Sequence, residues 1–344
     1  MTHMARAFIC GCGGAVLTAD EVDFLRRWRP WGLILFRRNV VDPQQVAALT
    51  ASFRDIVGRD DAPVLVDQEG GRVQRLAPPH WPAYPAAAKF SAATDDAREQ
   101  ERLAFDGARL IAHDLRAVGV TIDCLPVLDV PAPGSHSVIG DRAYAPEPDP
   151  VARLGRAAAD GLLAGGVLPV VKHVPGHGRA CADSHLELPV VNAPLDALRT
   201  RDFTPFRANA DLPLAMTAHV VFTALDPDRP ATLSPIVVDR VIRGEIGFDG
   251  CLMSDDLSMR ALSGSFGERA KALFAAGLDM ALHCNGDLAE AQQVAAATPF
   301  LAGRSEQRAR RALAMIAAPP ASFDIAAARA GLQAGLAGRV ADLA

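Results

Sequence analysis

The sequence predicts a (β/α)8 barrel, also called a TIM barrel, from the number and order of its apolar segments. Eight short apolar runs of strand length alternate mostly with runs that have the caps or the periodicity of helices. Such apolar runs are typical of parallel strands that are buried on both faces of a sheet. Eight strand–helix units within 344 residues suit a closed barrel. A doubly wound open sheet is the alternative, but no strand is followed by its glycine fingerprint, G-x-G-x-x-G.

The expected elements follow one another along the whole chain. The strands are expected at residues 7–10, 32–36, 63–66, 120–125, 167–171, 214–218, 250–253 and 279–282. Capping residues predict the helix starts, at Thr18, Asp42, Thr94, Asp149 and Ser234, and two further helices are expected at about 195–209 and 266–276. Because no linker divides the chain, we expect one domain over 1–344, with the barrel at about 5–285 and Ala-rich helices at 288–344.

Composition and charge exclude several classes of protein. Half of the residues are apolar, and a net charge of −5 with a pI near 6 leaves no basic footprint for nucleic acid. No apolar run approaches the roughly 20 residues that span a bilayer, so no membrane association is expected. The N-terminus lacks the apolar core of a signal peptide, which predicts a cytoplasmic protein. The six cysteines form no C-x-x-C pair and are expected to be reduced thiols.

Polar residues follow strand after strand in this pattern. They are Asp67, Lys172 with His173, His219, Asp255 with Asp256, and His283. In a barrel, the carboxyl ends of all strands meet at one face, where active sites of this fold are built. We therefore expect these side chains to converge on one pocket, with Asp129 and Arg142 in a loop above it.

The segment 167–191 concentrates histidines in a loop that follows a strand. His173 and His177 have a spacing that holds zinc on a helix, but Pro175 and Gly176 exclude a helix there. His177 is expected to bond loop backbone instead. Asp183 and His185 lie two residues apart, which suits a carboxylate that orients an imidazole for acid–base work. An Asx-turn with a solvated histidine explains the same spacing.

Asp255 and Asp256 are adjacent at a strand end, so only one of them is expected to face the barrel axis. The inward carboxylate is a candidate nucleophile, and Asp256 is well placed to cap a helix. Several charged side chains in one mouth indicate a polar ligand. The candidates for binding it are Asp67, Arg75, Arg142 and Lys172, although a surface role is the default for each arginine taken singly.

Nine segments together resemble glycoside hydrolase family 3, and closely its single-domain bacterial β-N-acetylhexosaminidases. They are GLILFRRN (32–39), VDQEGGRVQRL (66–76), LPVLDV (125–130), VIGDRAY (138–144), VKHVPGHG (171–178), DSHLELP (183–189), MTAHVVF (216–222), PATLSP (230–235) and GFDGCLMSDDLSM (247–259). Val174 departs from this pattern, because the family usually has Phe there.

The resemblance implies a role for each matched residue. It implies that Asp255 is the nucleophile, that His185 is the general acid and base, and that Asp183 orients and charges His185. It also implies that Asp67, Arg75, Arg142, Lys172 and His173 bind an N-acetylglucosamine unit. The loop at 176–188 is then expected to move and deliver His185.

The resemblance also implies the reaction and its setting. We expect a retaining double displacement, without metal or cofactor, that removes terminal β-1,4-linked N-acetylglucosamine from anhydro-muropeptides. The expected setting is cytoplasmic peptidoglycan recycling by a monomer that acts on a small-molecule substrate, with a link to cell shape and division. One rival is a metal-dependent barrel hydrolase that uses His173, His177, His219 and Asp255. A second rival is a non-catalytic sugar-binding protein, which needs neither a nucleophile nor a poised acid.

Overall fold

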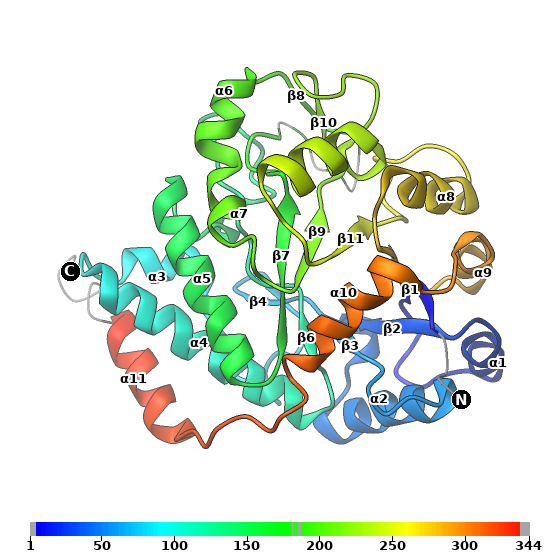
Figure 1. The fold of residues 1–344 in the computed structure, drawn as a ribbon. Helices are drawn as coiled ribbons and strands as arrows, with labels where there is room; N and C mark the ends of the chain where they lie inside the picture. Colours follow the sequence, from blue (N-terminus) through cyan, green and yellow to red (C-terminus); the bar gives the residue numbers. More distant parts are fainter. Residues whose placement is uncertain (1–4, 181, 183, 185–186, 338–344) are drawn as a thin grey trace.

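Eight parallel strands form a closed barrel in the computed structural model, which describes residues 5–180, 182, 184 and 187–337 (Figure 1). The barrel strands are β1 (Arg6–Cys10), β2 (Pro30–Leu35), β3 (Val64–Val66), β6 (Ile122–Asp123), β7 (Leu168–Val174), β9 (Leu214–Thr217), β11 (Cys251–Asp256) and β12 (Met280–His283). Each of these barrel strands pairs in parallel with the barrel strand that follows it along the chain, and β1 pairs with β12 to close the ring. The predicted fold class is therefore confirmed, and the open sheet is excluded.

Alternation along each strand divides the apolar side chains between two cores. On β2, Ile34 packs inside the barrel, whereas Leu33 and Leu35 pack against the surrounding helices. Phe8 and Ile9 divide in the same way on β1. Because successive side chains on a strand point to opposite sides, a strand with helices outside it must be apolar throughout. This requirement explains why the barrel strands read as continuous apolar runs.

The helices surround the barrel, mostly one after each strand (Figure 1). They are α1 (Ala19–Trp28), α2 (Pro43–Val57), α3 (Ala88–Ala92), α4 (Ala97–Ala117), α5 (Pro148–Ala164), α6 (Leu195–Ala197), α7 (Thr204–Ala208), α8 (Phe266–Ala276), α9 (Leu288–Ala297), α10 (Gly303–Ala314) and α11 (Ile325–Ala337). Short 3-10 turns form η1 (Arg37–Asn39), η2 (Gly140–Arg142) and η4 (Ala231–Leu233), and π-helical segments form η3 (Leu198–Asp202) and η5 (Val237–Glu245). Two small accessory sheets pair β4 (Gln68–Gly70) with β5 (Val73–Gln74) and β8 (Val190–Val191) with β10 (Val221–Phe222).

The predicted N-caps of α1 and α2 are confirmed, whereas the N-caps of α4 and α5 are residues close to the predicted ones. Thr18 forms a capping box with Glu21, and Asp42 accepts a hydrogen bond from the Gln45 amide. Helix α4 is capped by Asp96 rather than Thr94, because the Thr94 hydroxyl accepts from the Asp96 amide in a turn ahead of the helix. Helix α5 begins at Pro148, so Pro148 and not Pro150 occupies the first helical position.

Three other elements differ from the expectation. The strand expected at 120–125 is regular only in β6, because Pro126 has no amide hydrogen for a ladder. The helix expected at 195–209 is divided into α6, η3 and α7. The helix expected after Ser234 is π-helical and begins at Val237. None of these changes moves a strand out of the barrel.

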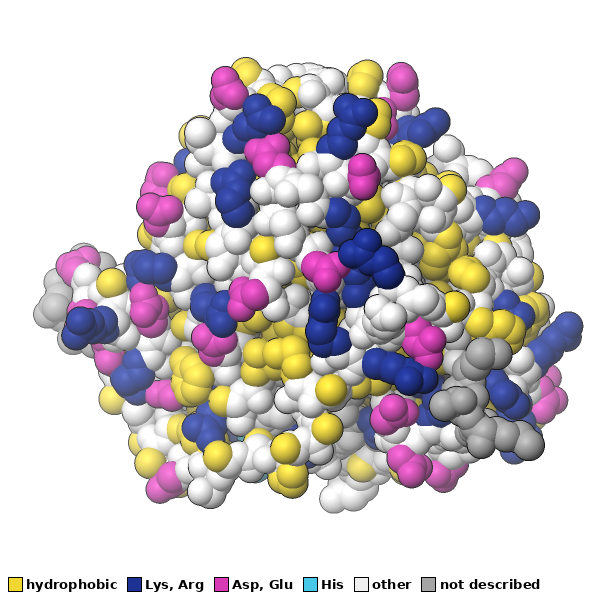
Figure 2. Space-filling model, viewed as in Figure 1, with side chains coloured by type: hydrophobic (Ala, Val, Ile, Leu, Met, Phe, Trp, Pro, Cys, Tyr) yellow, Lys and Arg dark blue, Asp and Glu magenta, His cyan; other side chains and the backbone are white. Residues whose placement is uncertain are grey.

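Helix α10 closes the amino-terminal end of the barrel (Figure 1). Ala309 and Ala312 on this helix pack into the core cluster that also contains the interior side chains of the strands. On the face seen in Figure 2, basic and acidic side chains are interspersed across the surface. None of the helices within the described residues is long and apolar enough to cross a bilayer.

Asp279, which directly precedes β12, joins the barrel to α10 and η5. Its carboxylate accepts hydrogen bonds from Arg243 at 2.7 Å, from the Leu252 amide at 2.9 Å and from Arg308 at 3.1 Å. The residue is 2% exposed, and neutralising it removes the carboxylate that pairs with Arg243 and one of the two carboxylates that contact Arg308.

We predict that Asp279→Asn lowers the free energy of unfolding by about 3–5 kcal/mol in urea titrations, because breaking one side of a buried ion pair is strongly destabilising. The control is Asp249→Asn, which removes an exposed carboxylate that also contacts Arg308. Exposed ion pairs contribute little, so this variant is expected to unfold close to wild type. Equal losses in the two variants would contradict the structural role of Asp279.

Candidate active site

A cavity of about 150 Å³ lies at the carboxyl end of the barrel strands. Its polar lining comes from residues that follow four different strands, and its apolar lining comes from both the barrel and the surrounding loops. The polar residues are Asp67, Glu69, Arg75, Arg142, Lys172, His173, His177, Ser184, Asp255 and Asp256, and the apolar ones include Ile34, Phe36, Val73, Ile139, Met216, Met259, Leu282 and Cys284. The five predicted sugar-binding residues therefore share one cavity with Asp255.

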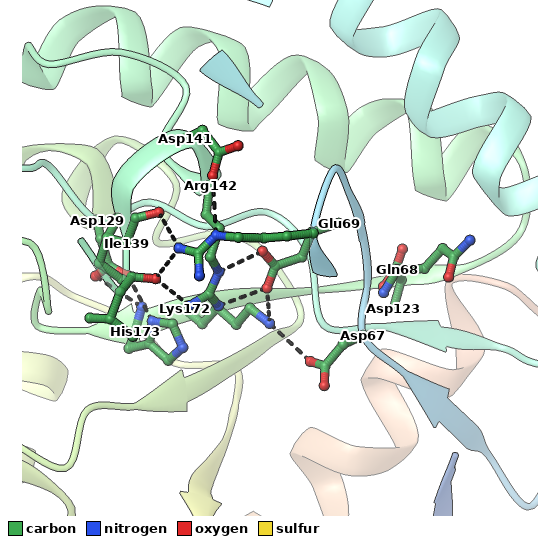
Figure 3. Close-up of polar contacts among 12 residues, drawn as sticks. Asp67, Gln68, Glu69, Asp123, Asp129, Ile139, Asp141, Arg142, Lys172 and His173 are labelled. Carbon is green, nitrogen blue, oxygen red and sulfur yellow. Dashed lines mark hydrogen bonds and ion pairs between the residues drawn. The ribbon is translucent and has the colours of Figure 1, made fainter. Parts of the chain in front are cut away.

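Two carboxylates and three cations form a network on one wall of this cavity, and Figure 3 shows the part formed by Asp67, Glu69, Arg142 and Lys172. The Lys172 ammonium lies 3.0 Å from an Asp67 oxygen and 2.6 Å from a Glu69 oxygen. Arg142 donates two hydrogen bonds of 2.8 Å to Glu69, one to each oxygen. Arg75 lies 2.9 Å from the second Asp67 oxygen. The network thus ties β3, β4, η2 and β7 together.

The network keeps its members charged. Burial raises the pKa of Asp67, but Lys172 and Arg75 outweigh this effect and hold the pKa well below its usual range. Burial likewise raises the pKa of Glu69, and Lys172 with Arg142 bring it below the ordinary value. Burial lowers the pKa of Lys172, but the two carboxylates raise it above that of an ordinary lysine. The two carboxylates and Lys172 are therefore ionised near neutral pH, and each is stabilised by its neighbours of opposite charge.

A glycine turn brings Asp67, Glu69 and Arg75 to the same wall. Gly70 and Gly71 have φ values of 91° and 56°, which lie in the left-handed region. A Cβ atom at Gly70 would lie 2.2 Å from the Pro85 carbonyl oxygen, so the close approach also requires glycine. The turn reverses the chain between β4 and β5, and it places Arg75 beside Asp67.

Asp129 lies beneath the cavity and orients two histidines. Its buried carboxylate contacts His173 Nδ1 at 2.7 Å and accepts a 2.6 Å hydrogen bond from the His177 amide. Because Nδ1 of His173 is engaged by Asp129, Nε2 is the nitrogen left to face a ligand. Asp129 was expected in a loop above the pocket, but the structure buries it against His173, where it is 0% exposed and does not line the cavity.

His177 has the structural role that its position in the loop predicts. Its amide bonds Asp129, and its ring lies 3.3 Å from the Ser184 hydroxyl, measured from Nε2 to Oγ. Burial, with the neighbouring His173, lowers the pKa of His177 to about 4. The ring is therefore neutral at physiological pH, and it buttresses the loop without carrying charge.

The two adjacent aspartates at the end of β11 have different surroundings. Asp255 borders the cavity, is 7% exposed and accepts a hydrogen bond of 2.8 Å from the Asp256 amide. The Asp256 carboxylate accepts from the backbone amides of Ser258 and Cys284. Asp256 was expected to cap a helix, but no helix starts there, and its side chain instead fixes the turn after β11.

Two of the predicted pocket histidines lie elsewhere. His219 bonds the Thr232 hydroxyl and the Asp256 carbonyl behind the cavity wall. His283 lies 3.2 Å from Glu290 and packs edge-on against Phe266, while its neighbour Leu282 lines the cavity. The prediction that every polar residue after a strand faces the pocket is therefore wrong, because adjacent residues on a strand point to opposite sides.

The residues of the rival metal site lie within the described part of the chain, whereas the proposed acid does not. Within the part of the chain that is described, no group of three or more His, Cys, Asp or Glu side chains is placed to hold a metal ion. This finding removes the set His173, His177, His219 and Asp255 as a ligand cluster. Asp183 and His185 lie outside the described residues, so their predicted roles stay predictions.

Glu69 is a site residue that the sequence analysis did not select. It is 5% exposed, lines the cavity and contacts both Arg142 and Lys172. Its spacing from Asp67 could have predicted this position. Glu69 lies two residues after Asp67, and residues i and i+2 of an extended segment share a side.

A (β/α)8 barrel with a pocket that pairs carboxylates with cations is typical of enzymes of the glycoside hydrolase class. The family model "Glycosyl hydrolase family 3 N terminal domain" matches residues 18–315. The chain therefore belongs to glycosyl hydrolase family 3, and it is a glycoside hydrolase.

Relatives and solved structures agree with this assignment. The chain is 41% identical over 276 residues to a beta-hexosaminidase of Methylococcus capsulatus, covering 79% of this chain and 80% of the relative. It is 39% identical over 313 residues to a beta-hexosaminidase of Pseudomonas aeruginosa, covering 90% and 91%.

Among solved structures, NagZ of Neisseria gonorrhoeae in complex with N-trifluoroacetyl-D-glucosamine matches with a TM-score of 0.83 and 32% identity over 97% of both chains. A family 3 beta-N-acetylglucosaminidase of Paenibacillus sp. matches with a TM-score of 0.80 and 32% identity. The match covers 92% of this chain and 63% of the longer Paenibacillus protein.

We predict that Glu69→Gln raises KM for a chromogenic glycoside by about tenfold or more, because Arg142 and Lys172 lose the carboxylate that orients them. Steady-state kinetics with circular dichroism as a check on folding measures this effect. The matched control is Glu101→Gln, which removes the carboxylate of an exposed arginine pair. An unchanged KM in folded Glu69→Gln would contradict the orienting role.

The lowered pKa of His177 predicts how stability depends on pH. Between pH 6.5, the ordinary value, and about 4, the unfolded state binds a proton that the folded state does not. Stability therefore falls as the pH falls through this window, by up to about 1.4 kcal/mol per pH unit for this group. Urea midpoints at several pH values should show a shallower loss for His177→Gln than for wild type. His80→Gln, which removes an exposed histidine, is the control, and parallel curves for His177→Gln and wild type would refute the assignment.

Proposed function

We propose that the chain is an exo-acting, retaining β-N-acetylglucosaminidase that hydrolyses terminal, non-reducing β-1,4-linked N-acetylglucosamine. The observation that carries the proposal is the buried carboxylate of Asp255 in the same cavity as the network of Asp67, Glu69 and Lys172. The names of the relatives support the hexosaminidase class, and NagZ of Neisseria gonorrhoeae was solved with a glucosamine derivative.

The proposed reaction is a double displacement at the anomeric carbon. The Asp255 carboxylate attacks this carbon and forms a glycosyl–enzyme ester, while His185 gives its proton to the departing aglycone oxygen. His185 then takes a proton from water, whose oxygen attacks the anomeric carbon and releases Asp255. Two displacements return the β configuration, and both proceed through oxocarbenium-like transition states.

A histidine is a physically reasonable acid in this scheme. Most retaining glycosidases use a carboxylic acid as the general acid, and its surroundings must raise the pKa of that acid. An unperturbed imidazole has a pKa near 6.5 and needs no such shift. Asp183, two residues before His185, supplies a carboxylate that orients the ring and stabilises its protonated form.

The charged wall suits recognition of sugar hydroxyl groups. A hydroxyl both donates and accepts, so it can bond a cation and a carboxylate at the same time. Lys172 and Arg75 supply donors next to the Asp67 acceptor, and Arg142 lies beside them on Glu69. His173 offers Nε2 to the same cavity. The proposed binding site for one terminal sugar unit consists of Asp67, Arg75, Arg142, Lys172 and His173.

The proposed physiological substrate is a peptidoglycan fragment, an anhydro-muropeptide that ends in N-acetylglucosamine. The beta-hexosaminidase relatives of this length come from bacteria, whose cell walls contain this linkage. The proposed setting is recycling of cell-wall fragments in the cytoplasm by a single-domain monomer. Hydrolysis there returns the sugar to wall synthesis and thereby links the enzyme to cell shape and division.

We predict that Asp255→Ala lowers kcat for an aryl β-N-acetylglucosaminide by about a thousandfold or more, because the covalent intermediate can no longer form. The control is Asp211→Ala, which removes an exposed carboxylate. Wild-type activity in Asp255→Ala would overturn the assignment.

His185→Ala provides the complementary test in the same assay. It should lose about a hundredfold with a poor leaving group and far less with a dinitrophenyl leaving group, which departs without protonation. Equal losses with both leaving groups would remove His185 as the acid.

A further inference from the structure

His219 takes part in a buried hydrogen-bond chain directly behind Asp255. Its Nε2 lies 3.0 Å from the carbonyl oxygen of Asp256, and its Nδ1 lies 2.8 Å from the Thr232 hydroxyl. The Thr232 hydroxyl in turn lies 2.8 Å from the Thr217 hydroxyl. His219 is 0% exposed and does not border the cavity, so it cannot touch a bound sugar.

The partners of His219 fix which ring nitrogen carries the proton. A carbonyl oxygen only accepts, so Nε2 must carry the hydrogen that it donates to Asp256. Burial lowers the pKa of His219, which keeps the ring neutral and leaves Nδ1 as an acceptor for the Thr232 hydroxyl. The Thr232 hydroxyl also lies 3.1 Å from the Ala218 carbonyl oxygen, so its single hydrogen is shared between that oxygen and Nδ1 of His219, and Thr217 donates to Thr232.

The backbone at Asp255 needs support that the sheet does not supply. Met253 pairs with Met280 and Asp256 pairs with Leu282, and the register between β11 and β12 shifts between these two positions. Such an irregularity interrupts the ladder at the place where Asp255 lies. The Leu282 amide bonds the Ser254 hydroxyl instead of a β11 carbonyl. Other contacts must therefore define where the Asp255 carboxylate points.

We propose that His219 is a positioning residue for the nucleophile: by holding the Asp256 carbonyl, it fixes the backbone of Asp256, the residue whose amide bonds the Asp255 carboxylate. This inference rests on the proposed role of Asp255. The Asp256 backbone is then held at its carbonyl by His219 and at its amide by Asp255 Oδ1. The Asp256 side chain adds two further bonds, to the amides of Ser258 and Cys284.

Positioning at this point affects the chemical step more than sugar binding. A displacement of about 1 Å between reacting atoms can cost a hundredfold in rate. Within the described residues, the charged side chains of the proposed sugar-binding wall bond one another and form no hydrogen bond with His219, Thr232 or Thr217, although β7 pairs with β9 beside Thr217. Loss of the His219 donor should therefore lower the rate of glycosyl–enzyme formation and leave the affinity for free N-acetylglucosamine unchanged.

The test compares His219→Leu with His219→Gln. The Gln side-chain amide can donate to the Asp256 carbonyl, whereas Leu fills similar space without a donor. We expect kcat/KM for an aryl β-N-acetylglucosaminide to fall by about 10- to 100-fold in His219→Leu, with the inhibition constant of N-acetylglucosamine within about threefold of wild type. His219→Gln should recover most of the loss. Thr50→Val, which removes a buried hydroxyl that bonds the Val118 carbonyl, is the control for a general loss of buried hydrogen bonding.

Three results would overturn the proposal. They are wild-type kcat/KM in folded His219→Leu, equal losses in the Leu and Gln variants, and a fall in N-acetylglucosamine affinity that accounts for the whole effect.

The tautomer of the His219 ring, measured by NMR in wild-type protein, provides a second test. It depends neither on activity nor on whether His219→Leu folds. In wild-type protein labelled with 15N at histidine, the ring of His219 should show the Nε2–H tautomer at neutral pH. The Nδ1–H tautomer would remove the bond to Asp256 and sink the inference. If wild type hydrolysed no β-N-acetylglucosaminide, the proposed function would fail, and the tautomer would still report on the hydrogen bond to Asp256.

Discussion

The ammonium of Lys172 is the charge around which the pocket is arranged. It is 2% exposed and lies between Asp67 and Glu69, and each of these carboxylates also holds an arginine. A buried charge without a partner is costly, so none of these groups can be moved alone. Segments that follow β3, β4 and β7 are thereby locked into one wall with η2. The wall is ordered before a ligand arrives, and for the proposed sugar this order lowers the entropy lost on binding.

The fold could be predicted because its determinants are local. The apolar runs, the capping box at Thr18 and the Asp42–Pro43 start each depend on a few adjacent residues. The errors come from competition between neighbouring candidates, as where Thr94 supports a turn and Asp96 caps the helix. The site is harder, because it depends on which side of a strand end a residue faces. His219 and His283 follow strands as predicted, yet the pleat directs them behind the wall.

The two sides of the cavity rest on different physical supports. The proposed sugar-binding wall is held by ion pairs among side chains, whereas the Asp255 carboxylate accepts a hydrogen bond from the amide of Asp256, whose carbonyl is bonded by His219. Family motifs in the sequence identify Asp67, Lys172 and Asp255 as chemical groups. They cannot identify Glu69 or His219 by chemistry, because these residues act through a neighbour that only the three-dimensional arrangement reveals.

Among the described residues, helix α10 closes one end of the barrel, so the cavity is open at the other end only. Its side chains, with the apolar interior of the described strands, fill the amino-terminal end, so a sugar in the cavity leaves by the mouth through which it entered. In the proposed double displacement, the aglycone must clear this mouth before water can reach the anomeric carbon. An aglycone that lingers there competes with water for the glycosyl–enzyme and regenerates the substrate. The rate at which the aglycone leaves through the cavity mouth therefore determines net hydrolysis, together with the chemical steps.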